Sequence, residues 1–260
     1  MRLVRCKYNS AIRWGVLKDS RVALLKEPPF ERIIPSKKSI SLSRVKLTVP
    51  AEPTKIVLVG LNYRDHAAEL NMPLPIDPVI FLKPPTALLA HGQKIVLPGG
   101  VDRLDYEAEL ALVIRKEAKN VSAEDALKYI LGYTCLNDVT ARDVQKKDGQ
   151  WTRAKSFDTF CPVGPWVETD FDPGKSTVIC RLNGAVRQRS QTTNLIFSVP
   201  YLVSFVSRVM RLFPGDIIST GTPPGVGAMK PGDHVEVEVC GIGVLKNSVV
   251  SENKAKRSHR

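Results

Sequence analysis

Short apolar runs rich in β-branched residues recur along this chain, and glycine, proline and asparagine separate them. From residue 55 onward the runs lie at 55–60, 78–83, 103–114, 129–138, 176–184, 215–220 and 234–250. Runs of this length between turn-forming residues are typical of β-strands. Segments with helical periodicity are fewer and lie at 123–130, 140–147 and 199–213. Since strands and helices do not alternate regularly, the pattern disfavours a doubly wound nucleotide-binding fold and predicts a mostly antiparallel β structure with a few helices, in the α+β class.

The two ends of the chain differ from this long middle part. Residues 1–50 contain three short strand-like runs, followed by a proline-bearing stretch at 27–39 that favours irregular structure. We interpret residues 1–50 as a small N-terminal β module with its linker, and residues 51–250 as the main domain. Residues 251–260 are basic and have almost no apolar side chains, which predicts a disordered tail.

The net charge of +12 comes from these ends. Residues 1–55 hold 13 Lys and Arg against 4 Asp and Glu, and residues 251–260 hold 4 against 1, whereas residues 56–250 hold 21 of each. No helix-turn-helix, RNP or zinc-finger pattern accompanies the basic ends. The charge therefore favours a solvated surface over nucleic-acid binding.

Hydropathy and cysteine usage restrict the cellular setting. The sequence has no run of 18 apolar residues and no apolar segment of the signal-peptide kind at its start, so we expect neither a membrane span nor secretion. Its five cysteines are scattered without a C-x-x-C pair, which favours neither a disulfide framework nor a zinc ribbon. The expected compartment is the cytoplasm.

Three carboxylates interrupt the apolar run 103–114, at Asp105, Glu107 and Glu109. Alternate residues of a strand share a face, so these acids either face water or lie beside a cleft where something positive holds them together. Asp138 ends the run 129–138, and it either caps the turn that follows or joins the cluster. If the acids meet away from water, a cation must neutralise them. An all-oxygen ligand set favours Mg²⁺, Mn²⁺ or Ca²⁺ over zinc.

Other segments carry side chains that could take part in chemistry. His66 and Glu69 are three residues apart in a short helix-like segment, so the carboxylate could orient the imidazole as a general base, or both could be solvated surface groups. Lys155 is either a surface lysine or an electrostatic partner for an anionic substrate. The glycine-rich loop 219–233 lacks the Walker pattern and favours a rigid, backbone-presenting loop.

Taken together, these segments resemble the fumarylacetoacetate hydrolase family. In family order the sequence shows GLNYRDHAAEL, PVIFLKPPTAL, DYEAELALVI, GYTCLNDVTARDVQ, WTRAKSFDTFCPVGPW, IFSVPYLVSFVS and GDIISTGTPPGVG, from about residue 56 to residue 250. The resemblance implies a mixed β-roll of the family's C-terminal domain type, preceded here by the small N-terminal β module. It also implies a homodimer.

The resemblance further assigns roles to nine residues. One divalent ion per subunit, Mg²⁺ or alternatively Mn²⁺ or Ca²⁺, is expected on Glu107, Glu109 and Asp138. The catalytic residues are expected to be His66, Glu69 and Lys155. The residues expected to contact substrate are Arg142, Gln145 and Thr222. Asp105 does not match a family ligand.

The function expected from these residues is metal-dependent hydrolysis of a carbon–carbon bond in acylpyruvate- or fumarylpyruvate-like diketo acids. The family motifs barely separate this reaction from decarboxylation of oxaloacetate or isomerisation of a 2-hydroxydienoate such as 2-hydroxyhepta-2,4-diene-1,7-dioate or 5-carboxymethyl-2-hydroxymuconate. A non-catalytic nucleic-acid-binding role for the basic N-terminus remains a remote alternative.

Overall fold

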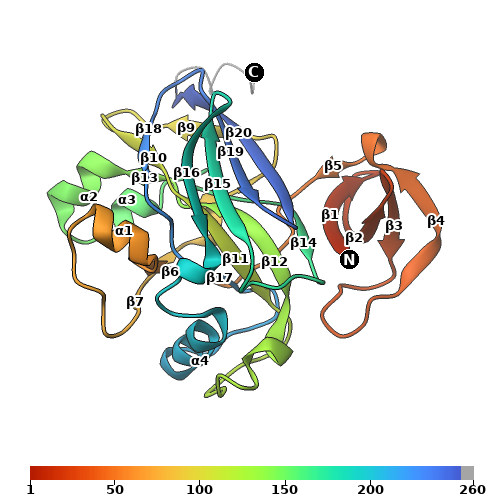
Figure 1. Cartoon of the computed structure of the whole chain (residues 1–260). Helices are drawn as coiled ribbons and strands as arrows, with labels where there is room; N and C mark the ends of the chain where they lie inside the picture. The colour runs from red at the N-terminus through yellow and green to blue at the C-terminus, as the bar shows by residue number, and fades with distance from the viewer. Residues whose placement is uncertain (253–260) are drawn as a thin grey trace.

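Strands form most of the molecule, and they are arranged in three sheets (Figure 1). The computed structural model describes residues 1–252, so residues 253–260 of the predicted tail lie outside the described residues. The mostly β architecture expected from the sequence is confirmed. Within the described residues, no helix has both the length and the apolar character needed to span a membrane.

The largest sheet runs in the order β4-β3-β2-β1-β14-β12-β11-β17-β6-β7, with β5 paired to β1 and β8 paired to β14. Its members are β1 (Arg2–Tyr8), β2 (Ala11–Lys18), β3 (Arg21–Leu25), β4 (Pro35–Ser41), β5 (Lys46–Leu47), β6 (Ile56–Gly60), β7 (Val79–Lys83), β8 (Leu88–Ala90), β11 (Ala108–Ile114), β12 (Ile130–Asn137), β14 (Cys161–Glu168) and β17 (Ile217–Ser219).

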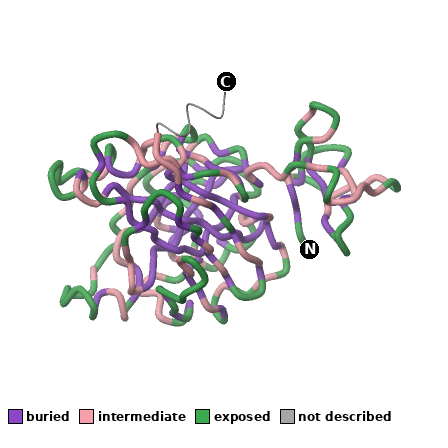
Figure 2. Tube along the Cα trace, turned by 90° about the horizontal axis from the view of Figure 1, so that it is seen from above, coloured by how far each residue is buried: buried purple, intermediate pink, exposed green. Residues whose placement is uncertain are grey.

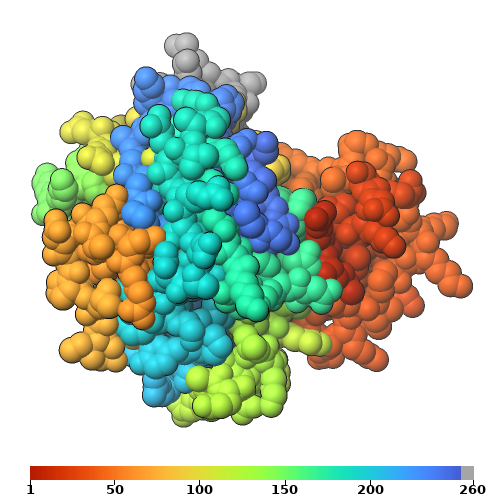
Figure 3. Space-filling view, viewed as in Figure 1, coloured from red at the N-terminus to blue at the C-terminus, as the bar shows by residue number. Residues whose placement is uncertain are grey.

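The N-terminal strands β1 to β5 form a lobe at one side of the molecule (Figures 1 and 3). This lobe is hydrogen-bonded to the main body, because Arg2 and Leu3 of β1 pair with Glu168 and Val167 of β14. The stretch 27–39 is less irregular than predicted, since β4 begins at Pro35 and pairs with β3. Proline is compatible with this position because β4 is the edge strand of the sheet, and the N–H groups along its outer edge need no partner strand.

Two smaller sheets complete the β structure. One has the order β13-β10-β18 and contains β10 (Leu104–Tyr106), β13 (Thr140–Ala141) and β18 (Gly227–Met229). The other has the order β16-β15-β19-β20-β9 and contains β9 (Lys94–Leu97), β15 (Thr177–Leu182), β16 (Ala185–Gln191), β19 (His234–Val239) and β20 (Gly243–Ser251). The main hydrophobic core includes buried side chains of β11, β12, β15 and β19, and Figure 2 shows this buried interior.

Helices are short and lie around the sheets. They are α1 (Arg64–Glu69), α2 (Arg142–Asp148), α3 (Thr152–Lys155) and α4 (Val199–Val209), with 3-10 turns at Leu42–Arg44, Pro85–Ala87, Ala126–Tyr129 and Thr192–Asn194. The helix predicted at 123–130 is wrong: only the 3-10 turn forms, and Ile130 already begins β12. The helix predicted at 199–213 ends at Val209.

The acidic run 103–114 is not one strand, because it changes sheets at Glu107. Residues before this point form β10, which pairs with β13 and β18, and residues after it form β11, which pairs with β12 and β17. The Glu107 N–H donates to the side-chain oxygen of Asn137 at 2.9 Å instead of a backbone carbonyl. This break places the acids at the junction of two sheets.

Candidate active site

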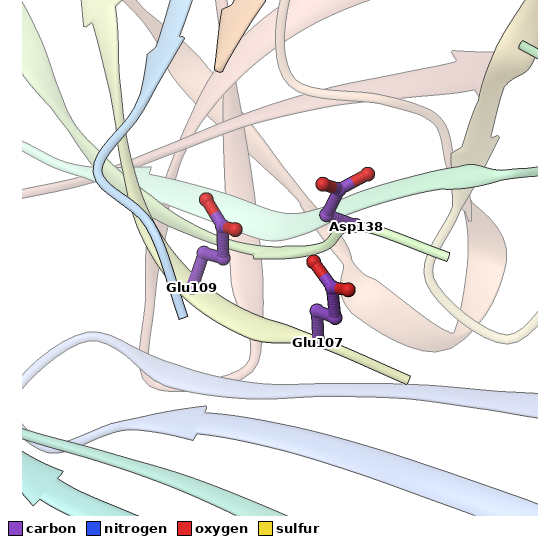
Figure 4. Close-up of side chains that lie close together, drawn as sticks. All are labelled: Glu107, Glu109 and Asp138. Atoms are coloured by element: carbon purple, nitrogen blue, oxygen red, sulfur yellow. The ribbon is translucent and has the colours of Figure 1, made fainter. Parts of the chain in front are cut away.

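The three acids predicted as metal ligands lie together at the junction of the sheets (Figure 4). Glu109 is on β11, Glu107 immediately precedes this strand, and Asp138 follows β12. Because β11 and β12 are antiparallel with Ala108 opposite Asn137, the residues before β11 and after β12 are neighbours. The Asp138 N–H donates to the Glu107 carbonyl at 2.8 Å and fixes this approach.

Two buried lysines contact these carboxylates. Lys155 Nζ, at the end of α3, donates to Glu107 Oε2 at 2.9 Å and to Asp138 Oδ2 at 2.5 Å. Lys83 Nζ, at the end of β7, lies 2.6 Å from Asp138 Oδ1 and donates to the backbone carbonyls of Val139 and Phe160. Asp138 is therefore held between two ammonium groups that are almost completely shielded from water.

Asp105, the acid of the run 103–114 that is not a predicted metal ligand, has arginine partners. Its carboxylate is fully buried and accepts from Arg142 Nε and from Arg103 Nε, each at 2.9 Å. Arg142 also donates through Nη2 to Glu107 and through Nη1 to Gln145 Oε1. Since Arg142 and Gln145 both belong to α2, these bonds tie the start of that helix to the acids.

The predicted general base, His66, and its carboxylate partner, Glu69, both lie on α1. His66 Nδ1 is 2.8 Å from Glu69 Oε2, and Glu69 Oε1 accepts from the Gly225 N–H at 3.0 Å. The start of the helix is fixed by Asp65, whose Oδ2 accepts from Ser190 and Asn194. The helix is thus fastened at both of its ends.

One cavity of about 680 Å³ brings all nine predicted site residues together. Its lining includes the acids, Arg142, Gln145 and Lys155 on one side, and His66, Glu69 and Thr222 from α1 and the glycine-rich loop. The Thr222 hydroxyl is already engaged, because it donates to the Ala108 carbonyl at 3.0 Å and accepts from Gln188 at 2.8 Å. The aromatic rings of Phe81 and Trp151 also line the cavity and contact each other edge to face.

Burial and neighbouring charges separate the two glutamates electrostatically. Burial raises the pKa of Glu109 to about 8, and the carboxylates of Asp138 and Glu107 add to this shift. Burial would also raise the pKa of Glu107, but Lys155 and Arg142 outweigh it and hold that pKa at about 2. Burial would lower the pKa of Lys155, but Asp138 and Glu107 raise it, so the lysine stays cationic.

Comparison with known protein families gives two matches. Residues 55–250 match the model described as fumarylacetoacetate (FAA) hydrolase, C-terminal. The chain belongs to the fumarylacetoacetate hydrolase family. A second model, described as Rv2993c-like, N-terminal, matches residues 1–50 of this family member.

Solved structures with similar folds have different enzyme names. The 5-carboxymethyl-2-hydroxymuconate delta-isomerase of Mycobacterium smegmatis is 44% identical, with a TM-score of 0.92 over 97% of this chain and 100% of that one. The maleylpyruvate hydrolase of Sphingobium sp. SYK-6, solved with manganese(II) and pyruvate, is 30% identical, with a TM-score of 0.80 over 96% of this chain and 99% of that one.

A third relative has another activity in its name. The mitochondrial oxaloacetate tautomerase of Bos taurus is 42% identical over 80% of this chain and 70% of its own length. Members of the family are thus enzymes that include hydrolases, isomerases and tautomerases.

The acids of this family member fit a hard divalent cation. Glu107, Glu109 and Asp138 each offer an oxygen, and these ligand atoms all lie within 4.8 Å of one another. Carboxylate oxygens are the ligands that Mg²⁺, Mn²⁺ and Ca²⁺ prefer. Burial is the main cause of the raised pKa of Glu109, and the carboxylates of Asp138 and Glu107 add to it, so a bound cation would favour the ionised form of this side chain.

Three residues that contact the buried acids were not predicted from the sequence. Lys83 ends an apolar strand and precedes two prolines. A lysine in an otherwise apolar run could have indicated that this side chain has a buried acidic partner. Arg103 lines the cavity next to Asp105, and the alternation of charges in RLDYE could have indicated this pair. Ser219, which donates to Glu109 at 2.5 Å, is an ordinary serine in the sequence and gave no signal.

Proposed function

We propose that this chain is a divalent-metal-dependent hydrolase that cleaves a carbon–carbon bond in acylpyruvate- or fumarylpyruvate-like diketo acids. The observation that carries the proposal is the shared cavity, in which the His66–Glu69 pair and the cluster of Glu107, Glu109 and Asp138 line the same space. A general base and a cation-binding group must reach one substrate for this chemistry.

The 2-oxo acid end of the substrate would bind at the acidic cluster and its basic neighbours. A cation held by Glu107, Glu109 and Asp138 would polarise the 2-oxo group as a Lewis acid. Arg142 and Lys155 contact these acids and also line the cavity, and they would attract the substrate carboxylate and offset the negative charge that develops on an enolate. Both positions are fixed by hydrogen bonds before substrate arrives, so little reorganisation is needed.

His66 would act as the base. Its Nδ1–H donates to Glu69, which leaves Nε2 as a proton acceptor. In hydrolysis, Nε2 takes a proton from water, and the hydroxide oxygen bonds to the distal carbonyl carbon. The carbon–carbon bond then breaks, its electron pair goes to C3 of the 2-oxo acid as an enolate, and the proton is returned to C3. The products are a carboxylic acid and pyruvate or a related 2-oxo acid.

A second function is proton transfer at C3 without attack by water, which would tautomerise oxaloacetate or isomerise a hydroxymuconate-like dienoate. The names of the relatives favour it, because the isomerase and the tautomerase are 44% and 42% identical to this chain, against 30% for the maleylpyruvate hydrolase. Metal-assisted decarboxylation of oxaloacetate would use the same enolate.

A substrate panel tests these functions. Acetylpyruvate, fumarylpyruvate, oxaloacetate and a hydroxymuconate are assayed with Mg²⁺ and after metal removal by a chelator. We expect metal-dependent hydrolysis of a diketo acid, and we expect His66→Ala to lower it about 100-fold or more. His234→Ala, on the exposed start of β19, is the matched control.

The outcomes separate the functions. Full hydrolysis by His66→Ala would show that this histidine is not the base. Turnover confined to oxaloacetate or the hydroxymuconate would replace the hydrolase by the second function. An absence of metal-dependent turnover on the whole panel would refute both.

A further inference from the structure

The cationic group of Arg103 is only partly used by the protein. Its Nε donates to Asp105 Oδ1 at 2.9 Å, and among residues 1–252 no other hydrogen bond or ion pair of the side chain occurs. Half of the side chain is exposed, at 50%, and it lines the cavity that contains the acidic cluster. Both terminal amino groups of this guanidinium are therefore available to a ligand.

Asp105 fixes the direction of this guanidinium. The fully buried carboxylate joins Arg103 on one oxygen and Arg142 on the other, and Arg142 in turn reaches Glu107. The order along the cavity wall is consequently Glu107, Arg142, Asp105 and Arg103. This chain of hydrogen bonds places Asp105 and Arg142 between Arg103 and the acidic cluster.

This outer part of the wall has a surplus of positive charge. Arg142 is also balanced by Glu107, so Asp105 offsets Arg103, and the exposed Lys146 of α2 adds a cation that has no side-chain partner among the described residues. Two further acids are already bound: Glu69 to His66 and to the Gly225 N–H, and Asp143 to the N–H groups of Asp102 and Arg103. An anionic group of a ligand is the complement of such a surface.

We propose that Arg103 and Lys146 bind a second carboxylate of the substrate, so that the enzyme favours dicarboxylic 2-oxo acids over monocarboxylic ones of the same length. The inference rests on the proposed function, because it assumes that the 2-oxo acid end binds at the acidic cluster. Arg103 offers a planar pair of N–H donors that matches a carboxylate, whereas Lys146 adds a mobile point charge. Arg103 is thus a specificity-determining residue.

Binding of two matched acids to the full-length, Mg²⁺-loaded protein tests this subsite without requiring turnover. The probes are 2-oxoglutarate and 2-oxopentanoate, which have the same five-carbon chain and differ in the distal carboxylate. We expect 2-oxoglutarate to bind about tenfold more tightly by calorimetry, from one partly exposed charge-assisted contact. The preference should shrink as ionic strength rises.

Variants assign the preference to its residue. Arg103→Gln should weaken binding of 2-oxoglutarate far more than binding of 2-oxopentanoate and so remove most of the preference, and Lys146→Gln should reduce the preference less. Arg13→Gln, an exposed arginine of β2 in the N-terminal lobe, is the control and should keep it. A thermal unfolding curve for each variant shows that the fold is retained.

The results distinguish this subsite from the function on which it rests. Equal affinity of the wild-type protein for the two acids would overturn the subsite but keep the 2-oxo acid site. A full preference retained by Arg103→Gln would also overturn it. Failure of both acids to bind the wild-type protein would overturn both proposals.

Discussion

Binding of a divalent ion to the metal-free protein should release close to one proton per chain at pH 7. The proton comes from Glu109, whose pKa of about 8 reflects burial and the nearby carboxylates of Asp138 and Glu107. One pH unit below its pKa a carboxyl group is about nine-tenths protonated, and it must lose its proton to become a ligand. Glu107 contributes no proton, because Lys155 and Arg142 hold its pKa at about 2.

The sign of the pH dependence follows from the raised pKa of Glu109. Between its ordinary value of 4.5 and about 8, the folded metal-free chain binds more protons at this site than the unfolded chain does. The contribution of Glu109 to the free energy of unfolding therefore declines as pH rises through this window. Metal affinity changes in the opposite direction and should rise by up to about tenfold per pH unit below pH 8.

Calorimetry in two buffers with different ionisation enthalpies measures the released protons directly. Titration with Mn²⁺ at pH 7 should give about one proton per ion, and at pH 9 about one tenth of that. Glu109→Gln, which has no proton to lose, is the control and should release none if it still binds the ion. Binding by the wild-type protein at pH 7 without proton release would refute the assignment of a protonated Glu109.

Two substitutions test the supports of the site. Lys83→Met removes one of the two buried cations that contact Asp138 and leaves the carbonyls of Val139 and Phe160 without this donor. We expect a loss of about 3 kcal/mol in the free energy of unfolding, measured with urea, at the low end for a broken buried ion pair because Lys155 still contacts Asp138. A loss below about 1 kcal/mol would contradict this. Gly225 has a positive φ, and Gly225→Ala would place a Cβ against the Arg187 carbonyl. Because the Gly225 N–H binds Glu69, the resulting shift of the loop should lower kcat in the steady-state assay. Gly232→Ala, which has a positive φ but no close neighbour, should keep kcat, and equal effects of both variants would show that the clash is irrelevant.

Periodicity and turn residues predicted most of the β architecture, because local sequence determines which segments are extended. The failures came from tertiary context. The segment 123–130 has helical spacing, yet Ile130 pairs with Ile114 of β11 and continues as the long strand β12, so pairing in the sheet overrode local preference. The change of sheet at Glu107 was equally invisible, because the partner of its N–H is the side chain of Asn137, thirty positions away.

In the site, too, local sequence predicted which acids lie on the same side, but not which distant residues bind them. Alternation along the strand placed Asp105 and the two glutamates on one side, and the cavity contains all three. The partners of each acid come from distant segments, so sequence spacing could not tell that Asp105 would receive two arginines while Glu109 would receive only a serine hydroxyl and an N–H. The resemblance to the family implied the roles of these residues, whereas their contacts depend on the folded structure.

The proposed metal centre is tested most directly by the number of Mn²⁺ ions bound, measured by electron paramagnetic resonance of the free ion during titration of the metal-free protein. We expect one site per chain in the wild-type protein, and loss of that site in the double variant Glu107→Gln, Asp138→Asn, with a folded control in Glu236→Gln on β19. Unchanged stoichiometry and affinity in the double variant would show that the metal centre lies elsewhere and would contradict the proposed function at its foundation.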